Sequence, residues 1–320
     1  MKFFIKKIYI VLFLLNILLI NSEVFAKNSK TEYTRENISN YFLGIISSNH
    51  NYNNDALKYL QKVQSIKNEH TQFNIEFLRT LVLLEKFDQA FSFSKSIWAK
   101  NEFLFEADLL LGLESFINKD YINAKKHFKR LNKISQYNLF FDEFIGNILI
   151  AWMEASEGKK EASFKFLEKV SKPYHHLIKI QKSFLECYFD MDNTQVSFEE
   201  LTQNQDYDFS RYNFFLTNYF LSKDNTGEAK KTIMRSSKKY NSNLLIKHTE
   251  KSLLNNKNKK IKNFFNCQNS RDTLAEFFYI LANLYSSEKE YQTSNFYLKI
   301  SFFLNNKFLT NKALLAENFY

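Results

Sequence analysis

Apolar residues recur along this chain at the three- and four-residue spacings of amphipathic helices, with short polar interruptions between them. In the stretch 106–131, Leu111, Phe116 and Phe128 follow this spacing, and residues 119–121 interrupt it as a short turn. Two consecutive helices account for the pattern, which returns along most of the chain. The hydrophobic pattern therefore predicts an all-α protein built from helix pairs.

Small side chains recur at an interval of 34 residues. A side chain larger than a methyl group would hold two crossing helices apart, so small residues at a regular interval indicate close helix crossings. We expect Gly112 at such a crossing, opposite Ala124, with Tyr121 and Phe128 filling the groove to the next pair. The positions at this interval are Gly44, Gly112 and Gly146, with Leu78 in place of the small residue in the second unit, then Ala56, Ala90 and Ala124, and finally Ala282 and Ala316.

The repeat resembles the tetratricopeptide family, whose units carry a small residue near the middle of the first helix, followed by an aromatic, an Ala and an aromatic. The resemblance covers about 36–135 and 272–320 and is weaker between them. It implies a right-handed superhelix (α-solenoid) of antiparallel helix pairs. The residues predicted to pack within or between repeats are Gly44, Ala56, Ala90, Gly112, Tyr121, Ala124, Phe128, Ala282 and Tyr291.

The repeat also predicts how the chain is divided. Residues 27–254 are expected to form tetratricopeptide-like repeats, and 272–320 one more repeat and the start of another. The Asn- and Lys-rich stretch 255–271 is expected to be a loop or linker. Because the sequence stops before the second helix of its last unit, we expect a fragment of a longer repeat protein; alternatively, the last helix is itself a cap.

Composition supports helices and narrows the function. Five Gly and one Pro in 320 residues are too few for the tight turns of a β-sandwich, a barrel or a nucleotide-binding sheet. The formal net charge of +10 raises the question of a nucleic-acid or anionic-membrane partner. Because Lys is interleaved with Glu and Asp, we interpret it as a solvated helical surface and expect no nucleic-acid partner.

Residues 1–26 have the layout of a secretory signal peptide. Lysines precede a largely apolar run at 8–20, and Val24 and Ala26 supply the small residues that predict cleavage before Lys27. The alternative is an uncleaved membrane anchor, but the run is shorter than the roughly 20 residues that span a bilayer. We therefore expect a periplasmic or secreted protein, for which membrane contact is the less favoured alternative.

The two cysteines, Cys187 and Cys267, form no metal-binding or redox spacing. An oxidising compartment would permit a disulfide between them, but the simpler interpretation is that both are small buried residues.

No motif for catalysis or cofactor binding is present. Five scattered Gly cannot form a phosphate-binding loop, and no nucleophile motif occurs. His175 and His176 are neighbours, but adjacent helical residues point about 100° apart and do not share a metal ion. The lysines of 257–262, with Phe264 close behind, favour a solvated loop over a lipid or nucleic-acid site. We expect no enzyme activity, no cofactor and no metal.

The family resemblance implies a partner in the concave groove lined by the first helix of each pair. We therefore expect a protein- or peptide-binding scaffold in the cell envelope. The alternatives are an accessory domain of an envelope enzyme whose catalytic part lies beyond residue 320, and a peripheral membrane-surface protein. The groove positions carried over are Arg79, Tyr279 and Asn283, with Tyr41, Ile45, Ile75, Leu109 and Leu113 beside them.

Overall fold

The computed structural model describes residues 33–99, 103–135, 144–170, 174–203, 210–308 and 311–318. Within these ranges the chain forms helices and no strand, which confirms the all-α prediction. The predicted signal peptide, 1–26, lies outside the described residues. No helix within the described ranges is long and apolar enough to cross a membrane.

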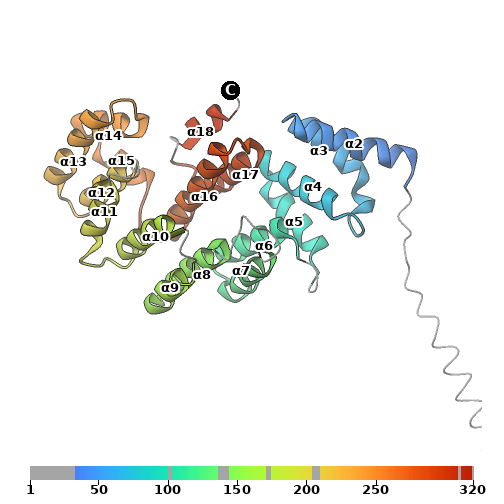
Figure 1. Cartoon of the computed structure of the whole chain (residues 1–320), viewed down its shortest axis with the longest axis horizontal. Coiled ribbons are helices and arrows are strands. Elements are labelled where there is room, and N and C mark those ends of the chain that lie inside the picture. Colours follow the sequence, from blue (N-terminus) through green and yellow to red (C-terminus); the bar gives the residue numbers. More distant parts are fainter. Residues whose placement is uncertain are drawn as a thin grey trace, which may run out of the picture.

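Successive helices pack against each other in pairs along the chain (Figure 1). A 3-10 helix, η1 (Gln61–Ile66), follows the first pair, and a short helix, α18 (Lys312–Glu317), follows the last. The pairs are α2 (Arg35–Asn49) with α3 (Asn53–Leu60), α4 (Thr71–Leu83) with α5 (Phe87–Ile97), α6 (Phe105–Ile117) with α7 (Tyr121–Ser135), α8 (Phe144–Ser156) with α9 (Lys160–Leu167), α10 (His175–Tyr188) with α11 (Thr194–Gln203), α12 (Tyr212–Ser222) with α13 (Thr226–Lys239), α14 (Leu244–Leu254) with α15 (Asn258–Phe264), and α16 (Ser270–Ser287) with α17 (Tyr291–Leu304).

The turn inside each pair has the same construction. One residue adopts a positive φ, and the N–H of the next residue donates to the carbonyl five positions earlier, as Tyr52 does to Ser47 at 2.9 Å. This Schellman arrangement satisfies the last carbonyls of the first helix. These turns follow one another at nearly even spacing, so the hairpin repeat also runs through 174–264, where the sequence pattern is weak. The positive-φ residues are Asn51, Glu85, Lys119, Gly158, Asp190, Asp224, Asn256 and Lys289.

The small residues lie at close helix crossings. A Cβ atom at Gly44 would stand 2.6 Å from Cδ2 of Leu60, and one at Gly112 would overlap the ring of Phe128. Both glycines thus lie where two helices approach closely, and the nearest neighbour of Gly112 is Phe128, where we expected Ala124. The alanines predicted to pack in the hairpins are fully buried: Ala56, Ala90, Ala124 and Ala282. Of the predicted packing tyrosines, Tyr121 is half-buried and Tyr291 is exposed.

The stretch 255–271 corrects the prediction of a loop or linker. It contains α15, whose Ile261 is fully buried and accepts a hydrogen bond on its backbone oxygen from Asn218 Nδ2 at 3.1 Å. Phe265 is buried as well. The Asn and Lys residues that suggested a loop lie mostly on the exposed side, while two apolar residues anchor the segment to α12 and α14.

The last hairpin, α16–α17, does not simply extend the row of pairs. It returns to the first helices of earlier pairs, because α17 packs on α4 and α16 packs on α8 and α10. Figure 1 shows this hairpin in the middle of the molecule, between α2–α5 and α11–α15. Contacts between distant parts of the sequence hold it: Gln292 Nε2 donates to the Ser48 carbonyl at 2.7 Å, Lys299 pairs with Glu85 at 2.6 Å, and Phe303 stacks on Phe87 at 4.0 Å.

A disulfide joins Cys187 of α10 to Cys267, just before α16. The interpretation of these residues as free buried cysteines is therefore wrong. Their pairing depends on the return of the chain toward α10, which brings Cα atoms separated by 80 residues in sequence to within 5.8 Å. The bond fixes the point from which α16 departs.

Candidate functional site

The concave groove implied by the family resemblance is largely covered by the chain itself. Leu109 and Leu113, expected to line that groove, are buried. Tyr279 lies in α16, inside the returning hairpin, and Asn283 is exposed near the end of the same helix. The structure therefore does not bring the predicted residues Arg79, Tyr279 and Asn283 into one open site.

Arg79 does line a cavity of about 330 Å³ that remains between the first helices and the returning hairpin. We call it the Arg79 pocket. Its walls come from α4, α6, α7 and the facing ends of α16 and α17, and they include Ile75, Arg79, Glu106, Ile134, Tyr285 and Tyr297. The pocket thus combines apolar walls with one cationic side chain.

The positive charge of Arg79 in this pocket is paired with a carboxylate. Nε of Arg79 donates to Oε1 of the buried Glu106 at 2.8 Å. Burial by itself lowers the pKa of Arg79, but Glu106, with smaller contributions from Glu76 and Tyr297, outweighs burial and raises the pKa, so the guanidinium stays charged. Burial also raises the pKa of Tyr285 and of Tyr297, which therefore face the pocket as neutral phenols. Among the described residues no acceptor is paired with Nη1 of Arg79.

Tyr279 belongs to a second cluster, which holds the returning hairpin in place. Arg211, at the start of α12, donates to both carboxylate oxygens of the fully buried Glu276, each at 2.7 Å. It also donates to Asn311 Oδ1 at 2.8 Å, and its guanidinium lies 3.8 Å from the centroid of the Tyr279 ring. Burial by itself lowers the pKa of Arg211, but Glu276, Tyr279 and Tyr212 together outweigh burial and raise the pKa. Tyr279 is half-buried and lies against Arg211.

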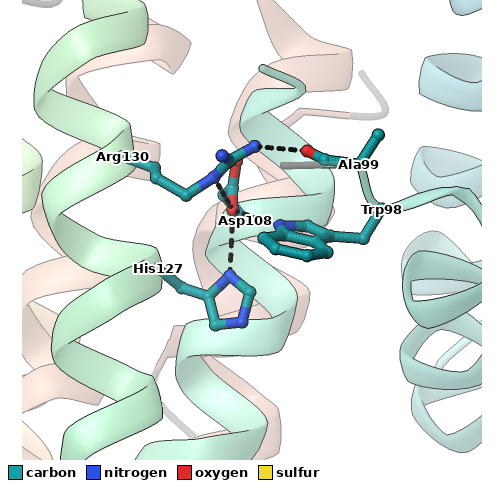
Figure 2. Close-up of polar contacts among 5 residues, drawn as sticks. All are labelled: Trp98, Ala99, Asp108, His127 and Arg130. Atoms are coloured by element: carbon teal, nitrogen blue, oxygen red, sulfur yellow. Dashed lines mark hydrogen bonds and ion pairs between the residues drawn. The ribbon is translucent and has the colours of Figure 1, made fainter. Parts of the chain in front are cut away.

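A third polar cluster fixes the connection between α5 and α6. Figure 2 shows Asp108 of α6 between Arg130, His127 and Trp98. Arg130 Nε donates to its two carboxylate oxygens at 2.8 and 3.0 Å, His127 Nδ1 lies 2.9 Å away, and Trp98 Nε1 donates at 3.1 Å. Arg130 Nη2 also donates to the Ala99 carbonyl at 3.0 Å. His127 and Arg130 are three residues apart on α7, so both reach one carboxylate.

The Asp108–His127 pair has the geometry of the orienting half of a hydrolase triad. However, Asp108 is fully buried and shared with Arg130, and His127 is itself buried. We interpret the cluster as structural: its hydrogen bonds hold Trp98 and α7 against α6. Sequence reasoning missed it, since one acidic residue in an apolar helix gives no signal until its partners are placed. Within the described residues, no group of three His, Cys, Asp or Glu side chains is placed to hold a metal ion.

No protein-family model matches this chain, and no curated protein matches it. The surfaces of the chain itself therefore carry the information on its function.

Helix α2 presents the clearest surface of this kind, which we call the α2 face. Large apolar side chains at every fourth position, Ile38, Phe42 and Ile46, are exposed, and Leu43 beside them is exposed too. Phe42 leaves 58% of its surface open to solvent. The opposite side of α2 is buried although it carries Asn40, Gly44 and Ser48. The usual arrangement of an amphipathic helix is thus reversed.

The buried side of α2 explains this reversal. Gly44 lets the helix approach Leu60, and Ser48 binds its neighbours with both of its oxygens: its hydroxyl donates to Glu76 at 3.2 Å and its carbonyl accepts from Gln292. The contiguous apolar strip of Ile38, Phe42 and Ile46 on the other side of α2 is exposed and lies outside the buried core. Exposed strips of this kind mark surfaces that bind other proteins.

Proposed function

We propose that this chain is a non-catalytic, tetratricopeptide-like repeat protein of the cell envelope that binds a partner protein through the α2 face. The observation that carries the proposal is the strip of Ile38, Phe42 and Ile46, exposed on a helix whose polar side is buried. Apolar residues at i, i+4 and i+8 fit the apolar groove of a partner or a partner helix laid alongside.

The repeat supports the architecture in this proposal. We propose that the pairs from α2–α3 to α14–α15 wind into the right-handed α-solenoid that the family resemblance implies. Support comes from the 34-residue interval of the small residues and from the uniform turns within the pairs. In such proteins each pair contacts mainly its neighbours, which leaves end surfaces such as the α2 face open.

Two observations support export to the periplasm or beyond. Residues 1–26 have the layout of a signal peptide. The Cys187–Cys267 disulfide is a bond that persists in oxidising compartments. We therefore propose a partner from the cell envelope or the cell exterior.

Affinity capture tests the proposal. The chain from residue 27 onward, which contains all described helices, would be immobilised and incubated with a cell-envelope extract, and the bound proteins quantified by mass spectrometry. In parallel, Phe42→Glu places a charge in the centre of the α2 face. We expect its bound partner to fall by tenfold or more, because burying a side chain of this size contributes about 2 kcal/mol.

Two further variants make the result specific. Ile122 on α7 is an isolated exposed apolar residue, with 85% of its surface open to solvent. Ile122→Glu should therefore leave capture unchanged. Arg79→Ala tests the Arg79 pocket. Loss of the partner with Arg79→Ala and not with Phe42→Glu would show that binding occurs on the inner face and that the α2 proposal is wrong.

A further inference from the structure

The net charge of the chain is concentrated in one region, contrary to the expectation of evenly interleaved charges. Residues 226–264, which span α13, α14 and α15, contain eleven Lys and Arg and only two acidic residues, Glu228 and Glu250. This region therefore carries +9 of the formal net charge of +10. Figure 1 places it at the end of the molecule opposite to α2.

Most of these cations face solvent. Lys231 and Lys247 pair with the two glutamates, and Lys262 pairs with Asp224 of the preceding turn at 2.8 Å. Within the ranges that the structure describes, six other exposed cations have no carboxylate within ion-pair distance: Arg235, Lys238, Lys251, Lys257, Lys259 and Lys260. We call the exposed surface of α13–α15 the basic cap.

Apolar side chains lie among the cations of the basic cap. Leu244, Lys247, Lys251 and Leu254 follow one another on α14 at spacings of three and four, so they share one face of that helix. Leu244 is 70% and Leu254 57% exposed, while the other side of α14 is buried in the core. On α13, Met234 is exposed next to Arg235. Lysine flanked by exposed aliphatic residues is the chemistry of a helix that lies on a lipid surface.

We propose that the basic cap binds the surface of an anionic lipid bilayer. Its lysines lie over the headgroup phosphates, and Leu244 and Leu254 enter the boundary between headgroups and acyl chains. Membrane binding at this end leaves the α2 face, at the other end, free for a protein partner. The inference rests on charge and exposure in α13–α15 and does not depend on the proposed use of α2.

The side chains of the cap favour lipid over nucleic acid. Only one of the eleven cations is Arg, whereas single-stranded nucleic acid is bound by Arg and by exposed aromatic rings on which bases stack. The large apolar side chains exposed here, Met234, Leu244 and Leu254, are aliphatic, and the nearby rings of Tyr240 and Phe264 are half-buried. Leucine side chains add binding energy at a bilayer but have no matching contact on a phosphate backbone.

Vesicle sedimentation tests the proposal with the chain from residue 27 onward. Mixed vesicles of phosphatidylcholine and the anionic lipid phosphatidylglycerol would be compared with pure phosphatidylcholine vesicles, at low and at high salt. We expect binding to the anionic vesicles alone, weakened by salt. Because each lysine near such a surface contributes about a fivefold factor in partitioning, Lys247→Gln/Lys251→Gln should reduce binding by about 25-fold. The matched control, Lys58→Gln/Lys62→Gln, removes two exposed lysines far along the chain and should bind as the unmodified chain does.

A second pair of substitutions separates lipid from other polyanions. Leu244→Ser/Leu254→Ser should weaken binding to anionic vesicles at both salt concentrations without changing thermal unfolding, since both side chains are exposed. An oligonucleotide that binds more tightly than the vesicles, with no effect of the leucine substitutions, would overturn the proposal. So would equal binding to neutral vesicles, or equal losses in the control variant.

Discussion

At Gly112 the absence of a side chain sets how closely α6 and α7 approach. A Cβ atom there would overlap the ring of Phe128, which is fully buried. The same offset of sixteen residues separates Gly44 from Leu60 in the first hairpin. The recurrence of small residues along the sequence thus has a direct steric cause at each crossing.

Gly112→Ala should destabilise the chain by about 1–3 kcal/mol, because the added methyl group overpacks the crossing. Thermal or urea unfolding measures the change. Gly227→Ala is the matched control: it lies in α13, where the nearest atom to a new Cβ is 3.8 Å away, so we expect no loss. If the two alanine variants unfold alike, the close contact with Phe128 does not limit the packing of α6 and α7.

At the level of helices, the repeat is more regular in the turns within the pairs than in the residue types on the helix faces. Seven of the eight positive-φ residues at these turns are not Gly, although Gly adopts that conformation at least cost. The Schellman hydrogen bonds compensate for this cost at Asp190 and Asp224, in the region where the repeat pattern of the sequence is weak. The helix pairs of 174–264 could therefore not be predicted in register from residue types alone.

The disulfide connects two elements, α10 and the start of α16. Cys267→Ser should lower the free energy of unfolding by about 2–4 kcal/mol, because the bond closes a loop of about 80 residues in the unfolded chain. Urea unfolding of the variant and of the unmodified chain, each with and without a thiol reductant, measures this. Reductant should destabilise the unmodified chain to the level of the variant and leave the variant unchanged. If reductant does not change the unfolding of the unmodified chain, the disulfide between α10 and the start of α16 does not stabilise the fold.

Across the whole molecule, the returning hairpin α16–α17 converts an open row of helix pairs into one connected core. Among its polar contacts, Arg211–Glu276 joins residues 65 positions apart in sequence and Ser48–Gln292 joins residues 244 apart. The hairpin also covers much of the inner surface on which the family resemblance would place a partner. For this reason the exposed ends of the molecule, at α2 and at α13–α15, carry the functional proposals.

The Arg211–Glu276 pair is the buried contact most specific to this arrangement. Glu276→Gln should cost about 3–5 kcal/mol, because it leaves the Arg211 guanidinium buried without its counter-charge. The double variant Arg211→Met/Glu276→Leu should recover most of that loss, since apolar residues of similar size often replace a buried ion pair. Urea unfolding of the unmodified chain, Arg211→Met, Glu276→Leu and the double variant gives the coupling. Losses that simply add would mean that the two residues do not interact in the folded chain.

The sequence by itself determined the helical class, the pairing of neighbouring helices and the glycine crossings, because these depend on hydrophobic periodicity and on side-chain size within a stretch of about 34 residues. It also contained the charge of residues 226–264, which a count over the whole chain concealed. Only the tertiary structure decided where α16–α17 lies, that Cys187 meets Cys267, and that Tyr279 contacts Arg211. These features depend on contacts between residues far apart in the chain, and no local pattern encodes which distant surfaces meet.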